Sequence, residues 1–384
     1  MTWITASEAV TLLGVQPQTL YANVSRGRIR AKPDPRDSRR SLYNSDDVRR
    51  LAARRRGRRT VASVAAETIG WGDPVLASGI STVERGRLWY RGQDAVALSE
   101  TSSLEDVAAL LWEAASTPFV HAEYSGVCVA NSDGSPLQAA LQVLASRVGS
   151  QLPVRGRPRR VLVVEAAGLV ADIACAMLGP TMPARAALHA RLAKAWGVPH
   201  AEDTLRRALV LLADHELNAS TFAARVAAST GGPLAAALLA GLATLSGPLH
   251  GGSSDAVCAL IESARKVGAA AGVRGLLVRG ERIPGFGHPL YDGDPRATAL
   301  FAHFRMTPIH VEVCAVVESL TGDRPNVDFA LAAMSDSFGL PSTAPLIVFA
   351  LARSVGWTAH ILEQVATGSL IRPRARYVGP PISP

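Results

Sequence analysis

Four short segments of the chain place a histidine or an aspartate among small or turn-forming residues. They are HELNAST at 215–221, GPLHGG at 247–252, PGFGHPLYDGDPRA at 284–297 and PNVDF at 325–329. Glycine lets a ligand come close to the backbone and accepts positive φ angles. Imidazole and carboxyl groups are the side chains that most often transfer protons in enzymes. The segments therefore indicate a site with acid–base chemistry.

Most histidines of a folded protein are satisfied core residues, and four here have no special setting: His121, His189, His200 and His360. That interpretation is much weaker for His250 and His288. Both are flanked by glycine, an aspartate follows in PNVDF, and arginines follow further downstream. The combination points to function, whereas a single histidine does not.

A metal centre and a dinucleotide site are alternatives for such residues. A metal centre would use His215, His250 and His288, but the chain has no HExxH and no short histidine spacing. The GFG at 285–287 lacks the third glycine and the preceding strand of a dinucleotide fingerprint. We therefore predict no metal and no bound cofactor.

In this order and at about these separations, the four segments resemble those of citrate synthases. Further similar stretches are LWYRG at 88–92, FALARSVGWTAH at 349–360 and IRPRARY at 371–377. The resemblance runs from about residue 70 to the C-terminus and is poor between about 118 and 200. It implies a mainly α fold with a large and a small helical domain.

The resemblance also implies an acyltransferase that condenses acetyl-CoA with oxaloacetate and hydrolyses the thioester, giving citrate and CoA. A thioester methyl group is a weak carbon acid, so its proton must be removed while a donor stabilises the enolate oxygen. Asp328 matches the base. His250 matches the donor to the thioester oxygen, where a helix N-terminus could keep the imidazole neutral. His288 matches the donor to the ketone oxygen of oxaloacetate.

Guanidinium groups can hold the two carboxylates of oxaloacetate by paired hydrogen bonds. By position in the motifs these groups are Arg296, Arg353 and Arg372, and His215 adds a contact. In the family the arginine that corresponds to Arg372 reaches into the site of the neighbouring subunit. The resemblance therefore implies an active homodimer, with domains that close over the substrates.

The segment GFGHPLYDGDPR departs from the family pattern. Pro289 follows the histidine, the gap before DPR is one residue shorter, and Asp292 stands near the place of a lysine that helps bind CoA phosphates in bacterial relatives. The loss bears on CoA affinity more than on the condensation, because His288, Arg296 and Asp328 are present.

Two further functions stay open. A 2-methylcitrate synthase would use propionyl-CoA with the same residues, since discrimination of one methylene is worth only ~1–3 kcal/mol and depends on pocket shape. A DNA-binding regulator could have kept the enzyme body as a metabolite sensor. The intact histidines and aspartate argue against a pure sensor, and the N-terminal segment argues for one.

The N-terminal segment carries all of the net positive charge. Residues 1–60 hold 14 Lys and Arg against 5 Asp and Glu, whereas the remainder is close to neutral. Two short amphipathic segments within 3–26, a turn at 33–37 and a following helix resemble the winged helix-turn-helix modules of MerR-type regulators and excisionases. We predict contacts to DNA phosphates from the basic residues Arg26, Arg28, Arg30, Lys32, Arg39 and Arg40.

The elements that must position the site are mostly helices. The chain is 48% hydrophobic and 19% charged, as expected of a folded protein. We predict a hairpin around Arg85-Gly86 and a buried helix over 234–245. The expected parts are a basic module at 1–60, a linker at 61–69, a large domain at 70–252 with 336–384, and a small domain at 253–335. Four scattered cysteines and no visible secretory signal favour the cytoplasm.

Overall fold

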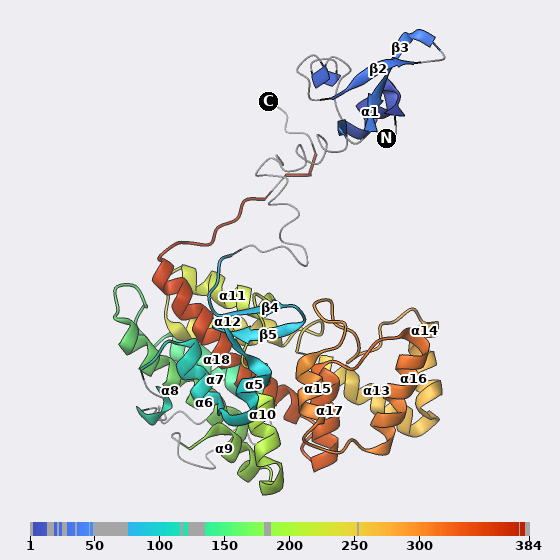
Figure 1. Ribbon diagram of the computed structural model, residues 1–384. Coiled ribbons are helices and arrows are strands. Elements are labelled where there is room, and N and C mark those ends of the chain that lie inside the picture. Colours follow the sequence, from blue (N-terminus) through green and yellow to red (C-terminus); the bar gives the residue numbers. More distant parts are fainter. Residues whose placement is uncertain are drawn as a thin grey trace. The chain divides into compact units, whose positions relative to one another are not determined.

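The computed structural model divides the chain into two compact units, Met1–Ala77 with Pro373–Pro384 and Ser78–Arg372 (Figure 1). Each unit is described by itself. The structure describes residues 3–13, 19–20, 23–24, 29–34, 37–45, 47–48, 76–115, 118–121, 135–179, 186–251, 253–375 and 377–380.

The described residues of the first unit form a small sheet, helix α1 (Ala6–Leu13) and a hydrophobic core of their own. The strands are β1 (Trp3–Ile4), β2 (Ala31–Asp34) and β3 (Asp37–Asn44), in the order β1-β3-β2 and with all pairs antiparallel. Ala9, Leu13, Leu20, Ile29, Tyr43 and Val48 form the core. Most of the predicted second helix lies outside the described residues.

The second unit begins with a three-stranded meander and continues as helices. The strands are β4 (Ser81–Glu84), β5 (Arg87–Tyr90) and β6 (Gln93–Asp94). The predicted hairpin is confirmed: β4 pairs with β5, and Arg85 and Gly86 form the turn with φ of 53° and 72°. Two positive φ angles in a two-residue turn match the right-handed twist of the strands.

The helices of this unit follow in chain order, and the helix predicted over 234–245 is confirmed as α12. The first group is α5 (Ala95–Thr101), α6 (Leu104–Leu111), η1 (Pro118–His121), α7 (Pro136–Val148), α8 (Arg159–Leu178), α9 (Leu188–Ala195), η2 (Pro199–Ala201), α10 (Glu202–Leu212), α11 (Ala219–Ser229) and α12 (Leu234–Leu245). The second group is α13 (Ser253–Val267), α14 (Ala269–Val278), α15 (Pro295–Phe301), α16 (Pro308–Thr321), α17 (Val327–Phe338) and α18 (Ala344–Thr367).

Helix α18 is the central element of the larger core. It packs against α6, α8, α10, α11 and α12, and nearly every residue from Ala344 to Leu362 is buried. A helix that is apolar on all sides belongs in a core or a membrane. By length and composition both α8 and α18 could cross a membrane, but most of each lies buried inside the structure.

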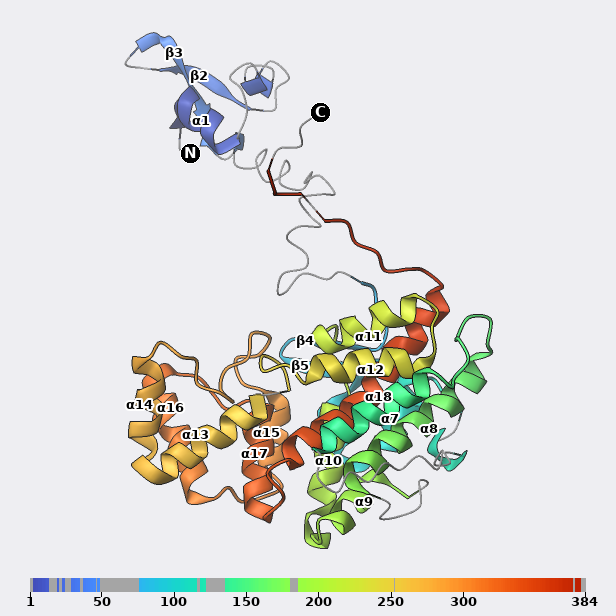
Figure 2. The same cartoon turned by 180° about the vertical axis from the view of Figure 1, so that it is seen from behind.

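Helix α17 belongs to two hydrophobic clusters. Seen from both sides (Figures 1 and 2), α13, α14 and α16 gather apart from α7, α8, α11 and α12. Val327, Ala330 and Leu331 of α17 join the larger cluster, whereas Phe329 and Ala333 join the smaller one, which is formed mainly by α13, α14, α16 and α17. The first turn of α17, which contains Asp328, therefore lies where the two clusters meet.

Candidate active site

Tyr291, in the loop before α15, contacts three of the predicted site residues. Its hydroxyl lies 2.9 Å from His215 Nε2. The rings of His288 and Tyr291 are 4.7 Å apart between centroids, and those of His215 and His288 are 5.2 Å apart. The guanidinium carbon of Arg296 lies 5.7 Å from the Tyr291 ring centroid. Two histidines and one arginine from different segments thus share one neighbourhood.

Glycine shapes the turn that carries His288. Gly285 has a φ of 81°, and a Cβ atom there would lie 2.7 Å from Val257 Cγ2 and 3.0 Å from Phe329 Cβ. Both the backbone conformation and the space therefore exclude a side chain at this position. The turn packs directly on α13 and on α17, next to Asp328.

His288 has a defined hydrogen-bonding direction. Its Nδ1 accepts the Leu290 N–H at 3.1 Å. Burial, helped by the charge of Arg296, lowers the pKa of His288 to about 4, so the ring is neutral at pH 7 and its proton is on Nε2. His288 therefore presents an N–H donor from Nε2.

His250 is also neutral near pH 7, but a different arginine acts on it. Burial first, and then the charge of Arg353, lower its pKa to about 4. Its Nε2 lies 2.7 Å from Ser220 Oγ, which also lies 2.7 Å from Asn218 Oδ1 and accepts the Trp357 Nε1–H at 3.1 Å. The single Ser220 proton goes to either Asn218 Oδ1 or His250 Nε2; when it goes to Nε2, the imidazole proton resides on Nδ1 and can be donated to a ligand.

Asp328 has the raised proton affinity of a candidate base. Removal from water, assisted by Asp294, raises its pKa to about 6, although Arg296 and Arg353 act in the opposite direction. The residue lies in the first turn of α17, where Asn326 Oδ1 accepts the Asp328 N–H at 3.0 Å. A carboxyl group of this pKa is ionised at pH 7 and still attracts a proton well.

Arg296 is bound within the chain by a partner that sequence reasoning missed. Its Nε and Nη2 donate to Asp294 Oδ1 and Oδ2 at 2.9 and 2.8 Å, and both side chains are buried. Asp294 Oδ2 also accepts the Val327 N–H at 3.0 Å. The ion pair therefore joins the first turns of α15 and α17, and two of the donor groups of Arg296 are already occupied.

Arg353 is also buried, but unlike Arg296 it has no paired carboxylate in the described part of the chain. Its side chain is 2% exposed, its Nε donates to the Leu212 carbonyl at 3.0 Å, and its guanidinium lies 4.7 Å from the Phe349 ring centroid. Across the described ranges it forms no ion pair. Asp214 and Asp328 act on its charge without pairing with it, and a buried charge without a paired counter-ion is costly. Phe349 also contacts His250, with 6.1 Å between ring centroids, so this cation lies beside the catalytic candidates.

His215 is almost fully buried, and burial, followed by the charges of Arg296 and Arg353, holds its pKa well below the usual value. Arg372 is exposed beyond the end of α18 and makes none of the contacts that join the other predicted residues. In the part of the chain that the structure describes, no three histidine, cysteine or acidic side chains are arranged to hold a metal ion.

The predicted DNA contacts are only partly described. Arg26 and Arg28, and the side chains of Arg39 and Arg40, lie outside the described residues. Arg30 donates from Nε and Nη2 to Asp47 at 2.7 and 3.0 Å. Lys32 Nζ lies 4.5 Å from the Trp3 ring centroid. Arg30 therefore has a carboxylate partner within the module, which the sequence did not indicate.

Sequence reasoning missed Tyr291, Asp294 and Ser220 as members of the site. Each lies inside or beside a segment that already contained a predicted residue, at 284–297 or 215–221. Their role depends on contacts between segments, such as the 76 residues that separate His215 from Tyr291. The sequence motifs therefore identified the region of the site, but not which side chains contact one another across segments.

Comparisons with known proteins show what the chain is similar to. The family model "Citrate synthase, C-terminal domain" matches residues 135–374. Citrate synthase 2 of Bacillus subtilis is 39% identical over 190 residues, which are 46% of this chain and 51% of that protein. A 2-methylcitrate synthase of Shewanella oneidensis is 38% identical over 184 residues, 44% of this chain and 49% of that protein.

The chain spans about half the length of the curated relatives it matches. A solved structure extends the likeness further. The crystal structure of citrate synthase from Thermotoga maritima superposes with a TM-score of 0.66 at 26% identity, covering 82% of this chain and 96% of that one.

Proposed function

Because the chain belongs to the citrate synthase family, we propose that it condenses acetyl-CoA with oxaloacetate and water to give citrate and CoA. Arg353 carries the proposal. It is a buried guanidinium without an ion pair among the described residues, and its charge acts on the neutral imidazole of His250 and on Asp328, whose pKa is about 6. Such a charge favours an anionic ligand, and oxaloacetate has two carboxylates.

The first step forms the nucleophile. Asp328 removes a proton from the methyl group of acetyl-CoA, and the electrons of the broken C–H bond form the C=C bond of the enolate. His250 donates a hydrogen bond from Nδ1 to the thioester oxygen, where negative charge develops. A neutral imidazole suits this role because it can donate without holding a competing full charge.

The second step forms the carbon–carbon bond. The enol carbon attacks the ketone carbon of oxaloacetate, and the ketone oxygen receives the electron pair of its π bond. His288 donates to this oxygen through Nε2, and the oxygen ends as the hydroxyl of the product; in the net reaction its proton balances the one that Asp328 removed from the methyl group. Water then attacks the thioester carbonyl, the C–S bond breaks, and CoA leaves as its thiol.

The CoA phosphates need a cation, and Asp292 does not supply one. Arg324 is a candidate, because a Cβ atom at Gly293 would lie 3.3 Å from its Cδ and 3.5 Å from its Nη1. The exposed guanidinium therefore lies over the backbone beside Asp292. We infer that Arg324 takes the role that a lysine of the loop has in relatives.

A 2-methylcitrate synthase is the second candidate for the same site. The relative of that name from Shewanella oneidensis is about as similar as the citrate synthase of Bacillus subtilis. Asp328 could deprotonate the methylene of propionyl-CoA as it does the methyl of acetyl-CoA, so the catalytic residues do not discriminate. The extra methyl group changes only the fit of the acyl pocket.

A CoA-release assay tests the proposal and separates these candidates. The full chain is incubated with oxaloacetate and either acetyl-CoA or propionyl-CoA, and the free thiol is measured. We expect release that depends on oxaloacetate, with a larger kcat/KM for acetyl-CoA, and a higher KM for acetyl-CoA in Arg324→Ala. A larger kcat/KM for propionyl-CoA would favour the second candidate. No release with either thioester would overturn the enzyme proposal and favour a metabolite sensor.

For the N-terminal unit we propose contact with DNA. The charge of residues 1–60 and the separate core beneath β3 and α1 support a folded basic module. Arg30 pairs with Asp47, and its side chain is still 56% exposed. The basic residues are sufficient for binding that is weak and indifferent to sequence.

A further inference from the structure

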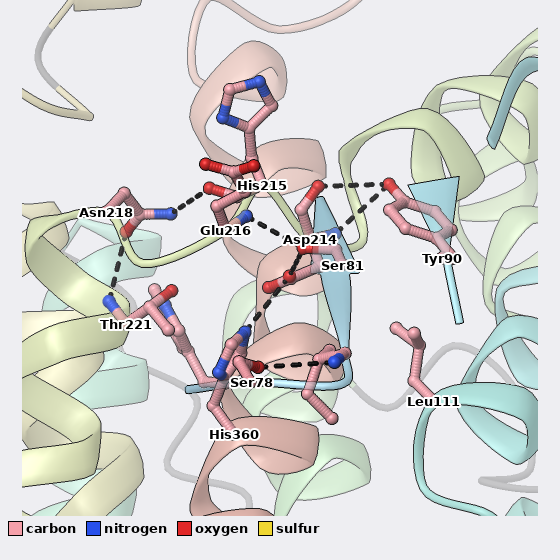
Figure 3. Close-up of polar contacts among 12 residues, drawn as sticks. Ser78, Ser81, Tyr90, Leu111, Asp214, His215, Glu216, Asn218, Thr221 and His360 are labelled. Carbon is pink, nitrogen blue, oxygen red and sulfur yellow. Dashed lines mark hydrogen bonds and ion pairs between the residues drawn. The ribbon is translucent and has the colours of Figure 1, made fainter. Parts of the chain in front are cut away.

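Asp214 and His360 form a hydrogen bond in the interior of the larger core. Both side chains are fully buried, and His360 Nε2 lies 3.1 Å from Asp214 Oδ2. Asp214 directly precedes His215, and His360 belongs to α18. Asp214 lies just outside the segments that carry the family resemblance, and His360, which ends the similar stretch at 349–360, was interpreted only as a satisfied core histidine. Figure 3 shows the two residues with their neighbours.

The hydrogen-bonding direction of this contact is fixed by Arg225. Its Nη1 lies 3.3 Å from His360 Nδ1, and because a guanidinium can only donate, Nδ1 must be the acceptor. The ring proton between His360 and Asp214 therefore resides on Nε2. Arg225 is held in turn by Glu363 and by Gln364 Oε1, the latter at 3.1 Å. The histidine is thus oriented from both sides.

The hairpin holds the chain on both sides of His215. Ser81 Oγ of β4 donates to Asp214 Oδ2 at 2.5 Å and accepts the Glu216 N–H at 2.9 Å. The Val83 N–H donates to Glu216 Oε1 at 2.5 Å. Glu216 has a φ of 51°, a conformation that non-glycine residues keep only when their surroundings impose it. The peptide of His215 is therefore fixed to β4 at its preceding and following residues.

Tyr90 of β5 adds a second anchor. Its hydroxyl accepts the Asp214 N–H at 3.3 Å and lies 3.1–3.2 Å from the carbonyls of Val210, Leu211 and Asp214. The hydroxyl therefore closes the C-terminal end of α10, and Figure 3 shows its contacts with Asp214. Unpaired carbonyls at a helix end are satisfied in this way.

One face of α18 packs against residues 212–214. Arg353, Gly356 and His360 follow one another at helical spacing and share this face. Arg353 Nε donates to the Leu212 carbonyl at 3.0 Å. A Cβ atom at Gly356 would lie 2.2 Å from the Ala213 carbonyl oxygen, so only glycine permits this approach. Residues 212–214 are therefore locked to the helix that carries Arg353.

We propose that Asp214 and His360 are positioning residues that hold His215 in register with Arg353 at the oxaloacetate end of the site. The inference rests on the proposed function for the identity of the ligand. Asp214 supplies the shared acceptor: its carboxylate binds the hairpin through Ser81 and α18 through His360. Loss of the His360 contact lets the 212–216 segment shift relative to Arg353, so that the two ligand groups no longer meet one dicarboxylate.

Three variants and one control test the proposal. His360→Leu removes the donor to Asp214, His360→Gln offers an amide N–H in its place, and Ser81→Ala releases the hairpin from Asp214 with less disturbance of the core. Ile361→Ala of α18 is the control, because Ile361 is equally buried but belongs to the hydrophobic cluster. Melting temperatures, KM for oxaloacetate and for acetyl-CoA, and calorimetric oxaloacetate binding are measured for each.

We expect His360→Leu to raise KM for oxaloacetate by about tenfold or more and KM for acetyl-CoA by less than about twofold, since a small misplacement of binding groups has effects of this size. Ser81→Ala should shift oxaloacetate KM in the same direction. His360→Gln should recover most of the affinity, and Ile361→Ala should lower the melting temperature without changing either KM.

Equal changes in oxaloacetate KM for His360→Leu and Ile361→Ala would overturn the proposal, because general destabilisation would then explain both. If His360→Leu does not fold, unchanged oxaloacetate affinity in Ser81→Ala overturns it. A wild-type chain that binds oxaloacetate without turnover would contradict the enzyme proposal alone, and calorimetry would still decide the role of the pair. A wild-type chain that binds no oxaloacetate would overturn both.

Discussion

At Asp328, burial and two arginines act in opposite directions on one carboxyl group. Burial prevails and raises its pKa to about 6. A base must be ionised to accept a proton, so activity should rise as pH increases through this value and then level off. We expect kcat/KM for acetyl-CoA to fall about tenfold for each pH unit below about 5.5. A pH–rate profile checks this, and a flat profile from pH 5 to pH 8 would contradict it.

Replacing Asp328 should affect the chemical step and spare substrate capture. Asp328→Asn keeps the shape of the side chain and loses the base, so kcat should fall by at least ~10²–10⁴-fold. Oxaloacetate binding, measured by calorimetry, should stay within about twofold. Asp255→Asn, which alters an exposed carboxylate of α13, is the matched control and should keep full activity. Near-normal kcat in Asp328→Asn would mean that another group is the base.

The residue types of the site could be predicted from the sequence, but their partners could not. Glycines beside His250 and His288 mark close approach of the backbone, and the short segments limit the candidates. Tyr291 has no such mark, because a tyrosine in a loop is common and its contact with His215 forms only in the fold. Arg296 was expected to bind a substrate carboxylate, and the sequence did not indicate that Asp294 occupies two of its nitrogens.

At the level of whole elements, the side chain of Asp294 joins the first turns of α15 and α17. Asp294 accepts from the Arg296 backbone at 3.0 Å, from the Arg296 guanidinium and from the Val327 N–H. Asp294→Asn leaves the buried guanidinium without its counter-ion, which should lower the free energy of unfolding by ~3–5 kcal/mol. Urea denaturation measures it.

Glu281→Gln is the control for Asp294→Asn. It removes the partner of Arg279 in an exposed ion pair, and pairs of this kind contribute little because water screens them. We expect its urea midpoint to match that of the wild type. A loss of stability for Asp294→Asn no larger than for Glu281→Gln would show that the buried pair does not support the two helices.

Local patterns predicted single elements well and the relations between elements poorly. The turn residues Arg85 and Gly86 predicted the β4–β5 hairpin. The glycines and proline before Leu234 predicted the start of α12. Both predictions are confirmed, because each signal is local. Helix α17 shows the limit: its residues divide between two hydrophobic clusters, and an apolar periodicity does not say which neighbour each side chain meets. Strand β1 was also missed, since two residues carry no pattern.

For the whole molecule, the exposed Arg372 allows a test of whether each active site is built from residues of two subunits. The homodimer, with Arg372 completing the partner's site, is a proposal from the family resemblance. Asp328→Ala and Arg372→Ala chains should each be inactive, and co-expression should restore part of the activity. Each mixed dimer has one site with an intact Asp328 from one chain and an intact Arg372 from the other. Mixed dimers without activity would exclude a shared site.

The basic N-terminal unit should bind duplex DNA in a salt-dependent way. Each neutralised phosphate releases counter-ions, so log affinity should fall linearly with log salt concentration. A fragment of residues 62–384 should lose this binding and keep its kcat. Gel shifts over a series of salt concentrations measure the slope. The absence of a shift at low salt would leave the unit as a protein-docking or stabilising element.

On the proposed function, the buried guanidinium of Arg353 should make the stability of the folded chain depend on the concentration of its dicarboxylate ligand. A ligand that binds only the folded state stabilises it by about 2.7 kcal/mol at one hundred times its dissociation constant. Without an anion beside Arg353 the folded chain lacks this contribution and opens more often, and proteases cleave the open form. When the dicarboxylate is scarce, the protein should therefore be degraded faster, so that supply of the substrate regulates the amount of enzyme as well as its rate.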